Sequence, residues 1–204
     1  MRHALIRIAV LASMIMTAAV TTASAQSAVT AEVVDALRKG GLVLLWRHPA
    51  THNDQADTDP LNLADCTRQR QLNDLGRQQS RDFGAALAGR SIPVMAIRTS
   101  PFCRAKEAAE LTGLGAVTID PDLGEGGLVV PPAENSRRAR ALRTLLSAAP
   151  QGGNLVLVSH RPNILDAVGV EAFTVAEGET LIYRARSAAP GFELVARVPI
   201  TDWR

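Results

Sequence analysis

Short apolar runs and longer amphipathic stretches follow one another regularly along the chain. Four aliphatic runs have the length of buried strands: 41–46, 94–97, 116–119 and 154–158. Apolar residues recur at helical spacing in the segments between and around them: 27–39, 72–89, 101–113 and 134–149. Two further runs, 180–185 and 192–198, predict a hairpin. This alternation predicts a three-layer α/β sandwich with a mostly parallel central sheet.

The ends of two predicted helices carry capping signals. Asn73 or Asp74 is expected to cap the helix that continues to about residue 89. Its core-facing side chains are expected to be Leu75, Phe83, Ala86 and Leu87. Ser100 is expected to cap the next helix, with Pro101 in its first position. Residues 49–71 lie before these helices and form a long polar loop, a length typical of functional or disordered segments.

The first 25 residues have the pattern of a secretory signal peptide. Arg2 and Arg7 form a basic start, an apolar segment follows over 5–20, and Ala23-Ser24-Ala25 is a typical cleavage site. We therefore predict a signal peptide at 1–25 and one domain at 26–204, exported to the periplasm or secreted. No later apolar stretch is long enough to span a bilayer, so no stable membrane insertion is expected after cleavage.

Charge and aromatic content provide no basis for a nucleic-acid partner. The formal net charge is +2, and loss of Arg2 and Arg7 with the signal peptide would bring it to about zero. Aromatic residues make up 3% of the chain, too few for the stacking platforms that bind single strands. We therefore expect no nucleic acid among its partners.

Cys66 and Cys103 are the two cysteines of the sequence. An even number in an exported chain favours a disulfide over two free buried thiols. The two residues would lie near the same edge of the sheet, where a bridge would hold the long polar loop. Neither cysteine has neighbours at metal-ligand spacing, so no zinc site is predicted.

Basic side chains follow three of the predicted strands: Arg47-His48 after the first, Arg104 after the second and His160-Arg161 after the fourth. The carboxyl ends of parallel strands meet at one rim, so these groups should converge there. Arginine forks match phosphate oxygens, and a helix starting near Ser100 would add backbone donors. The sequence therefore predicts a site for a tetrahedral anion at this rim.

Four segments of the chain resemble motifs of the histidine phosphatase superfamily, which has the phosphoglycerate mutase-like fold. Arg47-His48-Pro49-Ala50-Thr51 is similar to the motif R-H-x-x-[ST], and Leu72-Asn73-Asp74-Leu75-Gly76-Arg77-Gln78-Gln79 resembles L-[TS]-x-x-G-x-x-Q. Ser100-Pro101-Phe102-Cys103-Arg104-Ala105 resembles S-P-x-x-R-[AC], and Val158-Ser159-His160 resembles the second-histidine motif. The four segments occur in the family's order. Asp65-Cys66 with Gln69-Arg70 is also similar to exported, disulfide-bearing members. The resemblance covers most of residues 41–165.

The resemblance implies a metal-independent histidine acid phosphatase that needs no cofactor and hydrolyses phosphomonoesters through a phosphohistidine. His48 would be the nucleophile, kept neutral by nearby cations. Arg47, Arg104 and His160 would hold the equatorial oxygens of the transferring group.

The resemblance also implies a proton donor in the loop after the third strand. Glu125, in Leu123-Gly124-Glu125, matches the family's L-x-E element, and Asp122 is the reserve candidate. Arg70 is a further candidate phosphate contact, with Arg68 as an equal alternative. Thr51 could either orient the site or cap the turn.

The spacing of the motifs bears on the size of the substrate. Only 34 positions separate Glu125 from His160, and one predicted helix and one strand take most of them. This leaves no room for a large lid, so an open site is expected. An open site would suit a bulky substrate such as a phosphoprotein or an envelope glycolipid phosphate, and a small phosphorylated molecule is the alternative. The alternatives are a non-catalytic phosphate or phospho-ligand binding module of the same fold, and a phosphomutase.

Overall fold

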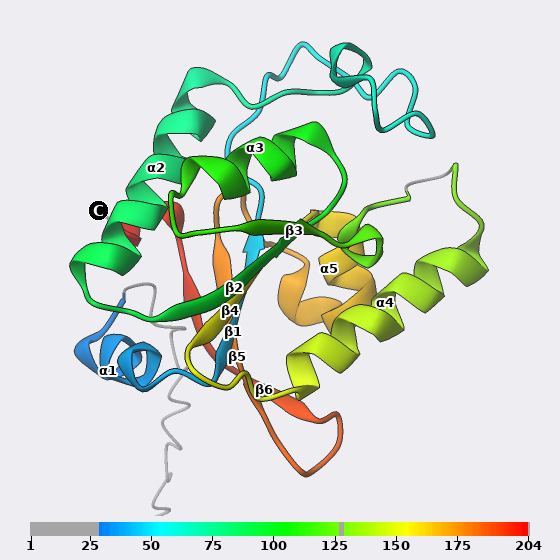
Figure 1. Cartoon of the computed structure of the whole chain (residues 1–204). Coiled ribbons are helices and arrows are strands. Elements are labelled where there is room, and N and C mark those ends of the chain that lie inside the picture. Colours follow the sequence, from blue (N-terminus) through cyan, green and yellow to red (C-terminus); the bar gives the residue numbers. More distant parts are fainter. Residues whose placement is uncertain (1–28, 127–128, 204) are drawn as a thin grey trace, which may run out of the picture.

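The computed structural model of the chain describes residues 29–126 and 129–203 (Figure 1). These residues form a six-stranded sheet in the order β3-β2-β4-β1-β5-β6. Its strands are β1 (Leu42–Arg47), β2 (Val94–Thr99), β3 (Val117–Ile119), β4 (Asn154–Ser159), β5 (Thr180–Ala185) and β6 (Phe192–Val198). The first four run parallel, and β5 and β6 add an antiparallel hairpin beside β1. The predicted mostly parallel sheet is confirmed.

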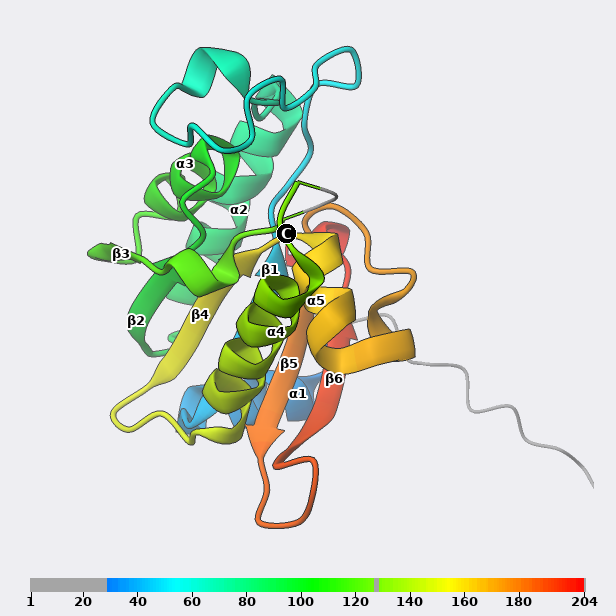
Figure 2. The same ribbon diagram turned by 90° about the vertical axis from the view of Figure 1, so that its right-hand side faces the viewer.

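Helices cover both faces of the sheet (Figures 1 and 2). One face carries α1 (Ala31–Lys39), α2 (Asp74–Gly89) and α3 (Cys103–Leu111), and the other carries α4 (Pro132–Ser147) and α5 (Arg161–Val168). Single turns of 3₁₀-helix occur at η1 (Cys66–Arg68), η2 (Pro121–Leu123), η3 (Gly169–Ala172) and η4 (Ile200–Trp203). The result is the three-layer α/β sandwich that the alternation of elements predicts.

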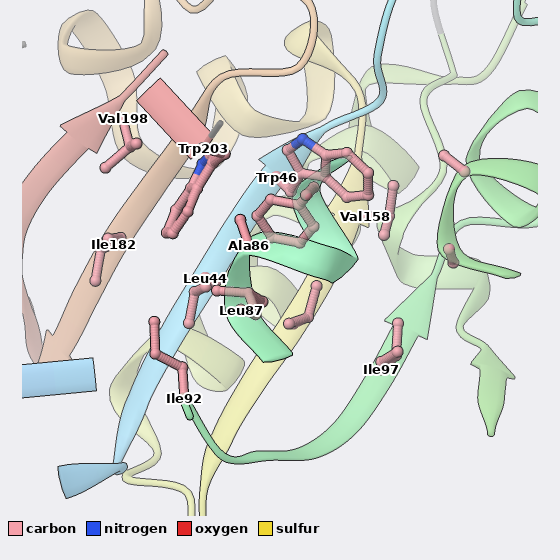
Figure 3. Close-up of a cluster of buried hydrophobic side chains, with 14 of the residues drawn as sticks. Leu44, Trp46, Ala86, Leu87, Ile92, Ile97, Val158, Ile182, Val198 and Trp203 are labelled. Carbon is pink, nitrogen blue, oxygen red and sulfur yellow. The ribbon is translucent and has the colours of Figure 1, made fainter. Parts of the chain in front are cut away.

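The central strand β1 is apolar from Leu42 to Trp46 because alternate side chains enter two separate cores. Leu44 and Trp46 belong to the cluster under α1, α2 and α3, part of which is drawn in Figure 3. Leu45 belongs to the cluster under α4 and α5. Trp46 stacks on Phe83 with ring centroids 4.3 Å apart, and Trp203 meets the same ring edge-on. Because both faces of β1 are buried, the strand is held firmly in place, and with it Arg47 at its end.

Some local expectations differ from the structure. α1 begins at Ala31 and is capped by Thr30, so it is shorter than the predicted helix, whose first residues lie outside the described ones. Leu75 is 53% exposed instead of core-facing, because Gly76 takes the inward position against the β1 turn. Met95 in β2 is 49% exposed, and it lies at an irregularity between Val94 and Ala96 where the register with β4 shifts.

The predicted signal peptide at 1–25 lies outside the described residues. Within 29–126 and 129–203, none of the helices combines the length and apolar character needed to cross a membrane.

Candidate active site

His48 follows β1 directly and is almost completely buried. Its backbone N–H donates to the carbonyl of Ser159 on β4 at 3.0 Å, which ties the two strand ends together. Its ring Nδ1 lies 2.9 Å from the carbonyl oxygen of Pro49. A carbonyl can only accept, so Nδ1 carries the hydrogen and Nε2 keeps its lone pair. Burial and then the charge of Arg104 hold the pKa of His48 well below its usual value.

His160 follows β4, is fully buried, and lies with its ring centroid 5.1 Å from that of His48. Its Nε2 is 2.6 Å from Ser100 Oγ, and that hydroxyl accepts from the Phe102 N–H. The Ser100 hydrogen is therefore available to Nε2, which places the His160 ring hydrogen on Nδ1, 3.5 Å from Glu125 Oε1. Burial and Arg104 also lower the pKa of His160 well below its usual range.

Arg104 lies in the first turn of α3 with its side chain fully buried. Its Nη1 donates to Asp57 at 2.9 Å, and its Nη2 donates to Glu125. The guanidinium carbon lies 4.6 Å from the centroid of the Phe102 ring. A buried cation requires compensating acceptors, and these two carboxylates provide them.

Arg47 and Arg70 lie on the other side of the site, around Glu177. The carboxylate of Glu177 is 3.6 Å from Arg47 and 3.8 Å from Arg70. It accepts from the hydroxyl of Thr51 at 2.8 Å and from the Thr51 N–H at 3.3 Å. Arg47 Nη1 also donates to the carbonyl of Val175. Thr51 thus orients the carboxylate that faces both arginines, and its hydroxyl is engaged there.

Glu125 is the acid that reaches the two central basic groups. It contacts Arg104 and His160, whereas the carboxylate of Asp122 pairs with Arg137 of α4 at 2.5 Å. Burial raises the pKa of Glu125, and the charge of Arg104 opposes this rise. This position favours Glu125 over Asp122 as the candidate proton donor.

Three buried nitrogen atoms at the site make no hydrogen bond with any described residue: Arg47 Nε, Arg104 Nε and His160 Nδ1. Buried donors are normally paired, so a group of unpaired donors indicates a place for an acceptor. All three belong to the basic side chains at the carboxyl ends of β1, β2 and β4. These three donors suit an anion with several oxygens.

The structure differs from the sequence-based expectations around α3 and α5. Ser100 does not cap α3, which begins at Cys103 with Phe102 as its N-cap residue. The Ser100 hydroxyl instead accepts from the Phe102 N–H and lies against Nε2 of His160. The guanidinium of Arg161 is bound to the carbonyl of Phe173 and adds no donor to the site. Between the two loop candidates, Arg70 approaches Glu177, while Arg68 donates to Thr58 in an exposed position.

Two acids of the site had no signal in the sequence. Asp57 is one of several acids in the polar loop after β1, and Glu177 precedes β5 in a segment without any recognised motif. Both can be found only from contacts, because nothing local distinguishes them from exposed loop acids.

The Cys66–Cys103 disulfide is present, with the two Cα atoms 5.7 Å apart. It joins η1 in the polar loop to the first residue of α3, next to Arg104. Gln69 adds to this junction, because its Oε1 accepts from the Cys103 N–H at 2.9 Å. The bridge therefore fixes the loop that carries Asp57 and Arg70 against the helix that carries Arg104.

The mostly parallel sheet flanked by helices, with two histidines and three arginines near the carboxyl ends of its parallel strands, has the architecture of the phosphoglycerate mutase-like fold. The sequence profile of the histidine phosphatase superfamily (branch 1) matches residues 43–131, a stretch that includes His48, Arg104 and Glu125. The resemblance to this superfamily is thereby confirmed. No curated protein sequence matches the chain significantly.

Solved structures of histidine phosphatase type share the fold. The protein histidine phosphatase SixA complexed with tungstate is 19% identical with a TM-score of 0.56, and the match covers 80% of this chain and 99% of that one. A variant phosphoserine phosphatase from Entamoeba histolytica in complex with phosphoserine is 16% identical with a TM-score of 0.58, covering 79% and 98%. Bacillus stearothermophilus YhfR is 17% identical with a TM-score of 0.55, covering 76% and 95%. At these identities the likeness concerns the fold.

Proposed function

We propose that the protein is a phosphatase that hydrolyses phosphomonoesters through a phosphohistidine on His48. The observation that carries the proposal is the set of three unpaired buried donors, Arg47 Nε, Arg104 Nε and His160 Nδ1, beside a histidine whose Nε2 lone pair is free to react. The donors suit the equatorial oxygens of a phosphoryl group, and the lone pair suits attack on phosphorus.

In the first step, Nε2 of His48 forms a bond to phosphorus while the bond from phosphorus to the ester oxygen breaks. Glu125 gives its proton to the departing alcohol oxygen, for which the raised pKa of this acid is suited. In the second step, a water oxygen bonds to phosphorus as the N–P bond breaks. The water proton returns to Glu125, so His48 and Glu125 are restored and inorganic phosphate leaves. Arg47, Arg104 and His160 stabilise the phosphoryl oxygens throughout.

Two carboxylates of the site also have a role in this cycle. Asp57 and Glu125 both bind Arg104, so an incoming phosphate competes with them for the same guanidinium. Its negative charge also favours the protonated form of Glu125, which is the form able to donate. Substrate binding would therefore prepare the acid for its step. A role for Arg70 beside Arg47 and Glu177 is part of the same proposal.

The test is hydrolysis of p-nitrophenyl phosphate with EDTA present, by the wild type and by His48→Ala. We expect activity in the wild type and its loss in the variant, with a trapped phosphoryl group on His48. Activity that survives His48→Ala, or a phosphoryl group trapped on another residue, would contradict the mechanism. Binding of phosphate without turnover by the wild type would instead support a phospho-ligand binding module.

Export is a second part of the proposal. The Cys66–Cys103 disulfide supports it, because such bonds persist in oxidising compartments. Mass spectrometry of the protein recovered from the periplasm or the medium would test it. We expect a chain that starts at Gln26, and an intact Met1 on the exported protein would contradict cleavage.

A further inference from the structure

A cavity of about 210 Å³ adjoins Glu125 on the side of α5. Its polar side chains are Glu125, Asn135, Asn163 and Asp166, and the rest of its lining is two glycines and a proline. Glu125 is shared between this cavity and the basic site, since the same side chain contacts Arg104 and His160. The acid that protonates a leaving oxygen must lie next to it, and this cavity is a space beside that acid.

The cavity lining is acidic, unlike that of the site beside it. Glu125 and the exposed Asp166 are carboxylates, and among the described residues no basic side chain lines the cavity. Asn163 is held by the protein itself, because Oδ1 accepts from Ser159 and Nδ2 donates to the carbonyl of Asp122. The nearest arginine of α4, Arg138, pairs with Glu134 and binds the carbonyl of Gly124.

At Gly126 the backbone lies close to the side chains of Asn135 and Val130. A Cβ atom there would lie 2.3 Å from Asn135 Oδ1 and 2.5 Å from the Cβ of Val130. A second cavity of about 450 Å³ shares Asn135 and Asp166 with the first and continues along α4 to Arg143. Arg143 donates to the carbonyls of Asp166 and Ala167. The path from Glu125 is therefore acidic at its start and has room for a larger group beyond.

We propose that this cavity binds the alcohol part of a phosphomonoester that carries an ammonium group a short carbon chain away from the phosphate, an inference that rests on the proposed phosphatase function. Asp166 pairs with the ammonium in the bound substrate. Glu125 becomes a second carboxylate beside it when its proton moves to the alcohol oxygen. The ammonium therefore stabilises negative charge that appears during the step, which favours catalysis as well as binding.

The test compares three phosphomonoesters of similar size that differ in charge: O-phosphoethanolamine, ethylene glycol monophosphate and phosphoglycolate. We expect kcat/KM to fall in that order, with about a fivefold advantage of the ammonium compound over the neutral one, as for a partly exposed ion pair. In Asp166→Asn this advantage should fall to near one. The matched control is Asp35→Asn in α1, on the opposite face of the sheet, which should leave the order and the ratio unchanged.

Binding calorimetry on His48→Ala measures the same preference without turnover. Tighter binding of O-phosphoethanolamine than of phosphoglycolate, weakened by Asp166→Asn, supports the proposal even if hydrolysis is absent. Equal binding of the two compounds, or a preference that Asp166→Asn leaves intact, overturns it. Absence of p-nitrophenyl phosphate hydrolysis would contradict the phosphatase function, whereas the binding results test the ammonium preference of the cavity. Failure of one proposal can therefore be distinguished from failure of the other.

Discussion

At the level of single residues, the chemistry of the rim depends on where two buried imidazoles hold their hydrogens. The Pro49 carbonyl places the hydrogen of His48 on Nδ1, and Ser100 places that of His160 on its own Nδ1. Burial and Arg104 lower the pKa of both rings, so both stay neutral over the ordinary pH range. One ring thus presents a lone pair and the other an N–H donor.

These pKa directions predict the pH dependence of activity. His48 acts when deprotonated, so activity rises with pH through its pKa, which lies well below the usual 6.5. Glu125 acts when protonated, so activity falls with pH through its pKa, which lies above the usual 4.5. We expect kcat/KM for phenyl phosphate, measured across the acidic and neutral range, to peak at acidic pH.

The variant Glu125→Gln shows which part of the pH profile is due to Glu125. The substrate titrates in the same way with the wild type and with the variant, so only the contribution of Glu125 differs between them. We expect the variant to flatten the basic side of the profile and to lower kcat for phenyl phosphate by about 100-fold. The loss should be smaller for p-nitrophenyl phosphate, whose leaving group needs less protonation. An unchanged basic side in this variant would contradict the role of Glu125.

Ser100 predicts a second residue-level effect. Ser100→Ala removes the partner of His160 Nε2, so the ring loses its preferred tautomer and orientation. We expect kcat/KM to fall about three- to tenfold, the equivalent of one hydrogen bond. Ser80→Ala is the matched control, because it also removes a buried hydroxyl that is hydrogen-bonded, to the carbonyl of Gly76 in α2. A similar loss of activity in both variants would indicate a general effect on folding.

Among the elements, the start of α2 sets the position of the turn after β1. The Asn73 N–H donates to the carbonyl of Ala50, and the Asn73 side chain donates to the carbonyl of Thr51. Gln79 Oε1 accepts from the Ala50 N–H one turn further along the helix. Gly76 lets the helix approach so closely that a Cβ atom would lie 2.0 Å from the Ala50 oxygen. The helix therefore holds the backbone just after His48 through Asn73, Gly76 and Gln79.

Gly76→Ala tests this contact between elements. The added methyl group must displace the backbone of the turn, so we expect the free energy of unfolding to fall by about 2–4 kcal/mol and activity to fall with it. Gly89→Ala in the last turn of the same helix is the control, because its Cβ would meet no atom within 4 Å. That variant should be neutral or stabilising by up to about 1 kcal/mol. Urea unfolding curves of both variants provide the comparison, and equal midpoints would contradict the contact.

At the scale of the whole molecule, the disulfide connects two parts that the sheet alone does not hold together. The polar loop after β1 lies at one end of the molecule, above α2 and α3 (Figure 2). Besides the bridge, Arg104 and Asp57 join this loop to α3 across the site. The covalent link and the ion pair thus serve the same purpose, which is to keep Asp57 and Arg70 at the rim.

Removal of the bridge should reduce both stability and activity. Cys66 and Cys103 are 37 residues apart, and closing a loop of this size is worth about 4 kcal/mol in the chain-entropy description. We expect the double variant Cys66→Ser/Cys103→Ser to lose free energy of unfolding of this order in urea. The wild type in a reducing agent should behave in the same way, which separates loss of the bond from the effect of the substitutions. Unchanged midpoints in both would contradict a stabilising role.

The sequence alone was sufficient for the architecture and for the basic half of the site. Apolar periodicity marks strands and helices because each element must bury one face, and parallel strands bring their carboxyl ends to one rim. The sequence therefore predicts that Arg47, His48, Arg104 and His160 lie together. The resemblance to a family singled out Glu125 in a loop that has no periodicity of its own.

Tertiary structure alone decided the acidic half and the fine geometry. Asp57, Asp166 and Glu177 come from segments far apart in the chain, and a buried cation can be matched by any acid that the chain path brings near it. The inward position of Gly76 and the contact of Ser100 with His160 likewise depend on neighbours distant in sequence. Local pattern determines which face of an element is buried, but contacts between loops depend on the packing of the entire fold.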